Sequence, residues 1–283
     1  MLTVEPTAEM IQEWKRIYDS SHSKDSSEFE ACYMESIEKT RREFEESFRL
    51  DSYYNRQTRD EEHLELILNC VPIKPGMRIL DLGTGTGYLA FAFARKYKSA
   101  EVIGLDIVEK TLEENRSKAL AQGLVNLQFV GYEGMKFPFE DSFFDVVVTR
   151  YALHHFPAIH DTFHEIHRVL KPNGTFFLSD PSPNDDDTER FVDEYMQMKK
   201  DGHIRFYTKQ EWVEIGTEAS LQFIDGFETV IRFPRKRETA FGFDEIVSRH
   251  DKNVINGYKV EVTDDEIWIT EKVNNLLYRE GTK

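Results

Sequence analysis

A glycine-rich turn that directly follows an apolar run constrains the fold of this chain more than any other feature. Residues 79–87 read Ile-Leu-Asp-Leu-Gly-Thr-Gly-Thr-Gly, and residues 88–97 continue with a helical pattern. Glycine has no Cβ atom and tolerates positive φ angles, so the chain can bend sharply between a strand and a helix while its N–H groups point at a polar ligand. The pattern therefore predicts a strand, a turn and a helix that hold a cofactor through backbone atoms.

The spacing of these glycines argues against a nicotinamide dinucleotide. A dinucleotide-binding turn has the pattern G-x-G-x-x-G. Here Gly87 follows Gly85 after a single residue, and Tyr88 stands where the third glycine of that pattern is required. NAD is therefore disfavoured as the cofactor.

Length, charge and hydropathy narrow the class of protein. The 283 residues suit one large α/β domain with an appendage. A net charge of −16 repels nucleic acid, and no apolar run approaches the roughly 18 residues that a membrane span requires. Residues 1–10 contain no apolar signal core, and the two cysteines suit buried thiols in a reducing compartment. We therefore expect a cytoplasmic protein that binds neither nucleic acid nor a membrane.

The apolar pattern divides the chain into a helical N-terminal part and an alternating β–α part. The apolar pattern of residues 1–60 predicts a helical cap or lid. Within it, Tyr53 and Tyr54 are expected to lie in a short connection and to overhang the mouth of the cofactor site. Residues 61–283 predict a Rossmann-like cofactor-binding domain, because short β-rich runs alternate with helical segments. Five runs are expected to form parallel strands: Arg78–Leu82, Glu101–Asp106, Leu127–Val130, Asp145–Thr149 and Gly174–Asp180.

The C-terminal third is expected to complete the sheet. Gly226–Phe233 is one β-like run, and Glu266–Thr270 with its continuation to Tyr278 is another, so the two predict an antiparallel edge pair. Between them, Asp244–His250 predicts a helix and Tyr258–Val262 a further short strand. The expected fold is an α/β, doubly wound, seven-stranded and mostly parallel sheet with an antiparallel C-terminal strand and an N-terminal helical cap.

Polar residues stand where several of the predicted strands end, which is where ligands bind in open α/β sheets. Asp106 follows the glycine turn by about 20 residues, the distance at which a carboxylate accepts hydrogen bonds from a ribose diol. Glu133 and Gly134 follow the third strand, where a carboxylate can accept from an adenine amine. His154 and His155 lie in an aromatic cluster that follows the fourth strand.

In this order and spacing, the segments resemble the class I S-adenosylmethionine-dependent methyltransferases, especially the small-molecule branch that includes the ubiquinone and menaquinone C-methyltransferase-like proteins. The resemblance covers roughly residues 60–233. It rests on five segments, namely residues 79–87, Asp106, Glu133 with residues 137–145, residues 150–156 and residues 165–174. The chain departs from the family at Glu133, where members usually carry Asp or Thr, and at Asn173, where they often carry a second glycine.

The resemblance implies which residues hold the methionine end of S-adenosylmethionine. Gly83 and Gly85 would contact the methionine part, and Asp81 and Thr84 belong to the same cofactor-binding motif. The backbone at Arg150 would lie near the methionine amino group.

The resemblance also implies how the adenosine end is held. Asp106 would bind the ribose hydroxyls, and Ile107 would cover one face of the adenine. Glu133 and the N–H group of Gly134 would bind the adenine edge. Tyr54 would overhang the bound cofactor, and S-adenosylhomocysteine would be the product.

The implied reaction is an in-line attack of a small-molecule acceptor on the sulfonium methyl group, for which alignment of the two reactants is the main task. A base is needed only where the attacking atom carries a proton. His154 and His155 are the candidates, because imidazole titrates near neutral pH. A role in shaping the loop is the other interpretation of these two residues.

Three further questions stay open at the level of sequence. A non-catalytic S-adenosylmethionine-binding sensor or assembly protein would carry the same cofactor motifs, and oxygen, nitrogen, carbon or sulfur acceptors all suit this fold.

His160, His164 and His167 share a helix face but lack the zincin pattern, so we interpret them as solvent-facing and expect no metal. A homodimer is one assembly that the aromatic N-terminal helices allow.

Overall fold

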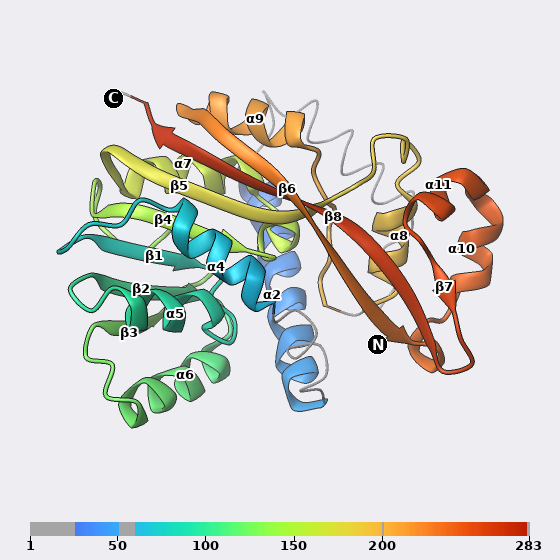
Figure 1. The fold of residues 1–283 in the computed structure, drawn as a ribbon, viewed down its shortest axis with the longest axis horizontal. Helices are drawn as coiled ribbons and strands as arrows, with labels where there is room; N and C mark the ends of the chain where they lie inside the picture. The colour runs from blue at the N-terminus through green and yellow to red at the C-terminus, as the bar shows by residue number, and fades with distance from the viewer. Residues whose placement is uncertain (1–25, 51–59, 200, 282–283) are drawn as a thin grey trace. The chain divides into compact units, whose positions relative to one another are not determined.

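A twisted sheet with strand order β3-β2-β1-β4-β5-β8-β6 forms the centre of the structure, a computed structural model that describes residues 26–50, 60–199 and 201–281 (Figure 1). The first five strands in chain order are β1 (Arg78–Leu82), β2 (Glu101–Asp106), β3 (Leu127–Gly131), β4 (Phe144–Arg150) and β5 (Leu170–Ser182). The C-terminal strands are β6 (Leu221–Lys236), β7 (Glu261–Val262) and β8 (Glu266–Glu280). Contacts along the chain separate Met1–Glu35 from Ser36–Lys283, and the sheet belongs to the second of these units.

The pairing of the strands confirms the predicted fold class. Strands β1 to β5 pair in parallel, and β8 runs antiparallel to both β5 and β6. The two-residue strand β7 pairs with β8 outside the main order, so it adds an eighth strand to the seven expected. It is shorter than the predicted run Tyr258–Val262, of which only the last two residues pair.

Helices cover both faces of the parallel part, which explains why its strands are apolar on both sides. Val146, Val147 and Val148 of β4 are all buried, as expected for a strand between two helical layers. One face packs against α4 (Glu61–Cys70), α5 (Tyr88–Lys96) and α6 (Glu109–Ala121). The other face packs against α7 (Ile159–Val169) and α9 (Lys209–Glu218).

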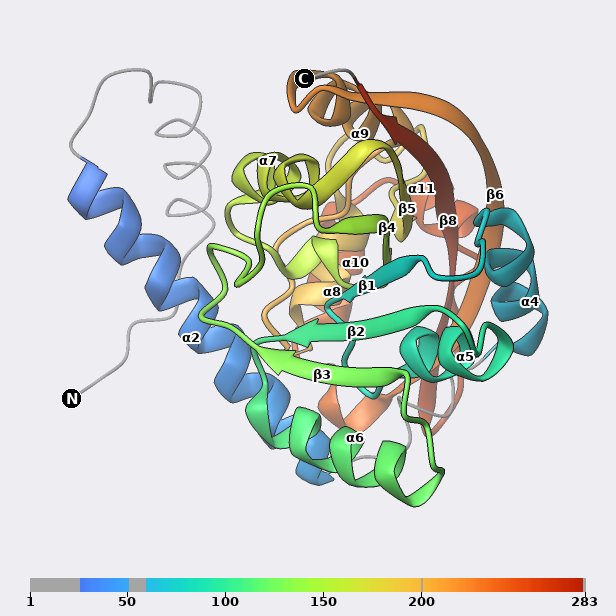
Figure 2. The same ribbon diagram turned by 90° about the vertical axis from the view of Figure 1, so that its left-hand side faces the viewer.

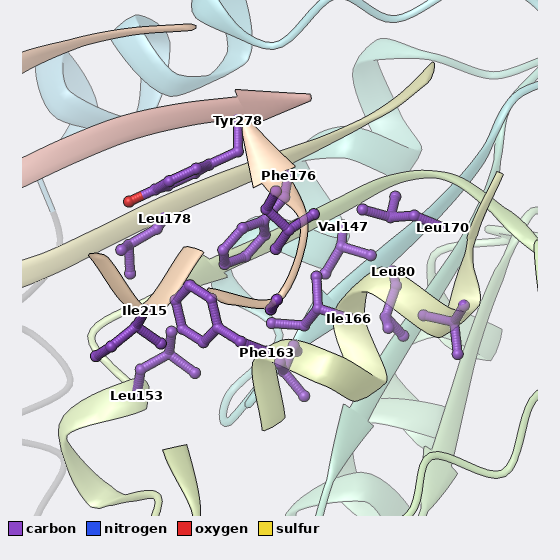
Figure 3. Packing of buried hydrophobic residues seen from close by; sticks show 14 of the residues in the cluster. Leu80, Val147, Leu153, Phe163, Ile166, Leu170, Phe176, Leu178, Ile215 and Tyr278 are labelled. Carbon is purple, nitrogen blue, oxygen red and sulfur yellow. The ribbon is translucent and has the colours of Figure 1, made fainter. Parts of the chain in front are cut away.

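The core under α7 and α9 shows how the layers interlock. Phe163 and Ile166 of α7 point into the space between Leu80 of β1 and Phe176 of β5, while Tyr278 of β8 closes the side near Leu178 (Figure 3). The Phe163 and Phe176 rings meet edge to face with their centroids 5.5 Å apart, an arrangement that aromatic pairs favour. This packing fixes the ends of β1, β4 and β5 relative to one another.

The pair β6 and β8 extends well beyond the parallel strands and carries a second helical layer that the sequence did not predict in full (Figure 1). Its far ends pack against α8 (Phe191–Gln197), α10 (Phe243–Arg249) and α11 (Lys252–Gly257). Of these three helices only α10 corresponds to a predicted element, the run Asp244–His250. The strands also run farther than the predicted segments Gly226–Phe233 and Glu266–Tyr278.

Of the predicted N-terminal cap, residues 1–60, the structure describes α2 (Ser26–Leu50) and Asp60, which caps the start of α4. From Ser36 onward α2 belongs to the same unit as the sheet, and it lies beside the arrowheads of β2 and β3 (Figure 2). Tyr53 and Tyr54 lie outside the described residues. Within the part of the chain that the structure describes, each helix is too short or too polar to cross a membrane.

Candidate active site

The carboxyl ends of the parallel strands meet at one edge of the sheet, and the predicted cofactor residues gather there. Leu82 at the end of β1 is in register with Leu105 of β2 and with Thr149 of β4, and Asp106 is in register with Gly131 of β3. The register alone therefore brings together the turn after β1, the loops after β2 and β3, and the end of β4. Tyr54 is the one predicted cofactor residue outside the described ranges.

The turn after β1 has the backbone that only glycine adopts readily. Gly83, Gly85 and Gly87 have φ angles of 67°, 48° and 79°, in the left-handed region that disfavours side chains. At Gly83 a Cβ atom would lie 2.5 Å from the Cβ of Ala152, so glycine is required for the close approach of the loop after β4. At Gly85 a Cβ atom would meet nothing within 4 Å. The middle of the turn therefore faces open space.

Asp81 and Thr84 stabilise this turn from within. The Asp81 carboxylate accepts hydrogen bonds from the Thr84 hydroxyl at 2.7 Å and from the Ala90 N–H at 3.0 Å. Asp81 is 2% exposed, and its burial raises its pKa to about 7. These contacts tie the end of β1 to the first turn of α5, so Asp81 acts on the position of the turn.

Asp106 joins the same turn to the end of β2. Its carboxylate accepts from the N–H of Gly85 at 2.8 Å and from the N–H of Val108 at 3.0 Å. Burial raises the pKa of Asp106, against the effect of these hydrogen bonds. Each carboxylate oxygen accepts more than one hydrogen bond, so Asp106 retains acceptor capacity for the hydroxyls of a ribose.

The loops at Ile107 and Gly134 both contact α2. The Arg41 Nε–H of α2 donates to the carbonyl oxygen of Ile107 at 3.2 Å. Gly134, with a φ angle of 105°, lies against Ile37, whose side chain a Cβ atom there would approach to 2.8 Å. The Glu133 side chain is exposed and accepts from the N–H of Lys136 at 3.0 Å. Helix α2 thus covers the two loops that are expected to hold the adenine.

At the end of β4, Arg150 lies between two aromatic rings. Its guanidinium carbon is 3.9 Å from the centre of the Tyr151 ring and 4.9 Å from that of Tyr88. Tyr151 has a φ angle of 55°, a conformation that costs energy for a bulky side chain. This bend turns the chain from β4 into the short 3₁₀ helix Leu153–His155, which holds both candidate histidines.

His154 is held by a carboxylate, whereas His155 packs against a ring. Asp180 at the end of β5 accepts from the backbone N–H of His154 at 3.1 Å and lies 2.9 Å from its Nδ1 atom. The His155 ring meets Phe44 of α2 edge to face at 4.9 Å. Burial lowers the pKa of both imidazoles well below the usual range, so both rings are neutral near pH 7.

Two further residues that support the turn were not predicted. Asn115 of α6 is fully buried, and its amide donates to the carbonyl oxygen of Gly85 at 2.7 Å. Gly104 of β2 leaves room for Thr84 and Phe129, because a Cβ atom would lie 2.8 Å from the Thr84 hydroxyl oxygen. Asn115 follows Gly85 by 30 residues in another element, so no local pattern indicates the contact.

A small hollow lies beyond the ends of β4 and β5, next to the cofactor edge. Its walls include Tyr151, His154, Met196, Phe206, Phe233 and Glu271. His154 therefore lies between the end of β4 and a small, mostly apolar hollow. This arrangement suits an acceptor that approaches the cofactor from the side of α8.

Two of the three histidines of α7 lie beside carboxylates, and the third is exposed. His160 Nδ1 lies 2.9 Å from the Glu218 carboxylate, and His167 Nε2 lies 3.5 Å from that of Glu280, while His164 is exposed. Across residues 26–50, 60–199 and 201–281, no group of three or more His, Cys, Asp or Glu side chains is arranged to hold a metal ion.

Comparison with known proteins shows the family to which this chain belongs. A model of the methyltransferase domain matches residues 73–220. The uncharacterized methyltransferase YcgJ of Bacillus subtilis is 32% identical over 165 residues, which cover 58% of this chain and 64% of that protein. The ubiquinone/menaquinone biosynthesis C-methyltransferase UbiE of a Ruegeria species is 33% identical over 115 residues, which cover 40% of this chain and 46% of that protein. The matched part thus spans less than two thirds of either relative.

Solved structures agree in fold. The crystal structure of YcgJ from Bacillus subtilis has a TM-score of 0.68 at 23% identity, with 79% of this chain and all of that chain covered. A putative methyltransferase from Bacillus halodurans has a TM-score of 0.70 at 23% identity, with 78% of this chain and all of that chain covered.

Proposed function

The chain belongs to the methyltransferase domain family, whose methyl donor is S-adenosylmethionine, and we propose that it transfers the methyl group of this donor to a small-molecule acceptor. The observation that carries the proposal is the glycine turn held between two carboxylates. Asp81 fixes the turn to α5 and Asp106 fixes it to β2, while Gly85 faces open space. A turn that is fixed on both sides and open in the middle suits a ligand that binds through backbone groups.

The residues at this edge fit the donor. Gly83 and Gly85 would lie along its methionine part with Thr84, and the backbone at Arg150 would lie near its amino group. Asp106 would accept hydrogen bonds from the ribose hydroxyls, and Ile107, Glu133 and Gly134 would surround the adenine. We propose Asp81 as a residue that supports the site from behind the turn, because its carboxylate is already bonded to Thr84 and Ala90.

His154 is the residue that we propose as the base. When bound, S-adenosylmethionine supplies an electrophilic methyl group and a neutral thioether leaving group. Burial raises the pKa of Asp180 well above its usual range, despite hydrogen bonds from the backbone of His154 and Ala152. The proposed base is therefore the form in which Asp180 has lost its proton: the ring proton of His154 then lies on Nδ1, and Nε2 is left as a proton acceptor. We propose a loop-shaping role for His155, since its ring packs on Phe44.

The proposed acceptor, location and assembly rest on separate observations. The hollow beside His154 has apolar walls suited to a small molecule, and the net charge of −16 disfavours nucleic acid. Cys70 is a free, partly buried thiol, as expected in the reducing cytoplasm. The homodimer is proposed from the aromatic N-terminal helices alone, and light scattering would contradict it by giving the monomer mass of 33.3 kDa.

Calorimetry and a transfer assay test the proposal in sequence. The protein is titrated with S-adenosylmethionine, S-adenosylhomocysteine and NAD, and we expect the first two to bind and NAD not to bind. Donor with a labelled methyl group is then incubated with a small-metabolite extract, and label should move into a product of low mass. Binding without transfer would favour a sensor or assembly protein, and binding of NAD alone would overturn the cofactor assignment.

A further inference from the structure

The hollow beside His154 contains a carboxyl group that the chain itself does not satisfy. Glu271 of β8 lines the hollow and is 1% exposed. Its Oε1 atom has no hydrogen-bond partner, and among the described residues Glu271 forms no salt bridge. Buried polar groups almost always have a partner, and an unpaired one destabilises the folded state. Glu271 thus offers an acceptor atom to a molecule that enters the hollow.

The walls around this carboxyl group are aromatic and apolar. The rings of Tyr151, Phe206 and Phe233 and the side chain of Met196 line the same space. Ring faces attract cations, and they also pack against apolar skeletons. A single acidic group within such walls is suited to a molecule that is apolar along its length and cationic at one end.

The charged groups around Glu271 are mostly occupied by other partners. Asp193 of α8 lies 2.9 Å from His203, and Lys199, just after α8, lies 2.7 Å from Asp201. Asp180 of β5 binds His154. Arg235 of β6 attracts Glu271 from beyond salt-bridge distance and stacks on the Tyr195 ring at 4.7 Å, while its Nη1 and Nη2 atoms have no hydrogen-bond partner. Asp201 also has a buried oxygen without a hydrogen-bond partner, Oδ1, but it does not line the hollow. Glu271 is therefore the carboxyl group that offers a free oxygen to the hollow itself.

We propose that Glu271 recognises the methyl acceptor, and that the acceptor is a small molecule with an apolar skeleton and a protonated amine. This inference rests on the function proposed above, because the hollow adjoins His154 at the end of β4. The carboxylate of Glu271 binds the ammonium group, while Phe206 and Phe233 pack against the skeleton. No bond forms or breaks at Glu271, so it determines specificity and takes no part in the transfer.

Three matched probes test the charge of the acceptor. Phenethylamine, 2-phenylethanol and 3-phenylpropionate share an aromatic skeleton and differ in the polar end. Each is titrated by calorimetry into protein saturated with S-adenosylhomocysteine. We expect phenethylamine to bind at least about tenfold more tightly than the other two, the size of effect that one charge-assisted hydrogen bond supplies. Preference for the alcohol or the carboxylate, or binding of none of the three, overturns the proposal.

Variants then test whether Glu271 causes the preference for the amine. Glu271→Gln keeps the shape of the side chain and should abolish the preference for the amine, while affinity for S-adenosylhomocysteine stays unchanged. Glu228→Gln on the neighbouring strand β6 is the control, because Glu228 is an exposed carboxylate. An amine preference that survives Glu271→Gln overturns the assignment. Wild-type protein that fails to bind S-adenosylhomocysteine contradicts the proposed function, and this inference then falls with it.

A measurement on the wild-type protein keeps the test independent of the variant's folding. Burial raises the pKa of Glu271 to about 8, so at pH 7 the carboxyl group must lose its proton before it pairs with an ammonium group. Binding of phenethylamine should therefore release about one proton. Titrations in two buffers with different heats of ionisation measure this number, and release of about one proton would support the pairing with Glu271.

Discussion

The carboxylate of Asp106, the last residue of β2, accepts a hydrogen bond from the N–H of Gly85 in the turn after β1, at 2.8 Å. Two neighbouring strands therefore share one support at the point where their carboxyl ends meet. The position of a ligand held by this turn therefore depends on β2 as well as on β1.

Asp106→Ala should weaken binding of S-adenosylhomocysteine about 10- to 100-fold. The substitution removes a charged acceptor for ribose hydroxyls, and hydrogen bonds to charged groups contribute about 1.5–3 kcal/mol. Isothermal titration calorimetry gives the dissociation constant, and Asp264→Ala, at an exposed carboxylate before β8, is the control. Because Asp106 also holds Gly85, circular dichroism must show that the variant is folded. An unchanged dissociation constant would rule out the ribose contact.

Gly85→Val should abolish binding of the same ligand while the protein remains folded. The added side chain would project into the open space over the turn and would also be strained at a φ angle of 48°. Gly123→Val separates these effects, because Gly123 has a φ angle of 64° and open space around it, but lies in the turn after α6. We expect the control to lose some stability and to keep its affinity. Wild-type affinity in Gly85→Val would show that the turn does not hold the methionine part.

Residues that act within one element or at a strand end were predictable, and contacts between distant elements were not. The place of Asp106, at the end of β2 and beside the turn, was predictable because a strand, a turn and a spacing of about 20 residues indicate it together. The partnership of His154 with Asp180 spans 26 residues, and that of Arg41 with Ile107 spans 66. Both depend on tertiary packing, which leaves no periodic signal in the chain.

The second helical layer also depends on tertiary packing that the sequence pattern does not indicate. Helix α8 has seven residues and begins after Arg190, whose φ angle is 63°. An element of two turns contains too few apolar positions to show a helical period. Its Phe191 and Tyr195 are buried only because β6 and β8 extend far enough to form a surface for them. The hollow beside His154 takes its Ile231, Phe233 and Glu271 walls from these long strands, whose lengths propensity alone does not determine.

Asp81 should make the protein more stable in mild acid than at neutral pH. Burial raises the pKa of Asp81 to about 7 in the folded state, whereas an unfolded chain has an Asp pKa of about 3.9. Between these values the folded state binds the proton and the unfolded state does not, so this contribution to stability falls by about 1.4 kcal/mol per pH unit as the pH rises from about 4 to about 7. Above the folded pKa it changes no further.

Asp81→Asn isolates this contribution, since an amide oxygen still accepts from Thr84 and Ala90 but does not titrate. Urea unfolding of both proteins at pH 5 and pH 8 gives two free energies of unfolding for each. We expect the wild-type protein to lose more stability than the variant between these pH values. Equal losses would show that Asp81 stays ionised in the folded protein.

The part of α2 from Ser36 onward should respond to the cofactor, because it contacts the loops on both sides of the expected adenine site. Ile37 packs on Gly134, and the Arg41 Nε–H binds the carbonyl oxygen of Ile107. A ligand that stabilises these loops also stabilises the helix that rests on them. Hydrogen exchange over residues 36–45 should therefore slow when S-adenosylhomocysteine is added, while α9, on the core beneath the opposite face, should change little.

The same contact predicts a change in affinity. Arg41→Ala should weaken S-adenosylhomocysteine binding about 3- to 10-fold, because one hydrogen bond contributes about 0.5–1.5 kcal/mol and this one orders the Ile107 loop. Arg42→Ala is the matched control, since Arg42 is the next residue of the helix and is exposed. Exchange that is identical with and without ligand, together with equal affinities of the two variants, would mean that α2 is a fixed structural cap. Protection on binding would support a lid, since such a segment orders as the site closes and excludes water from the methyl group.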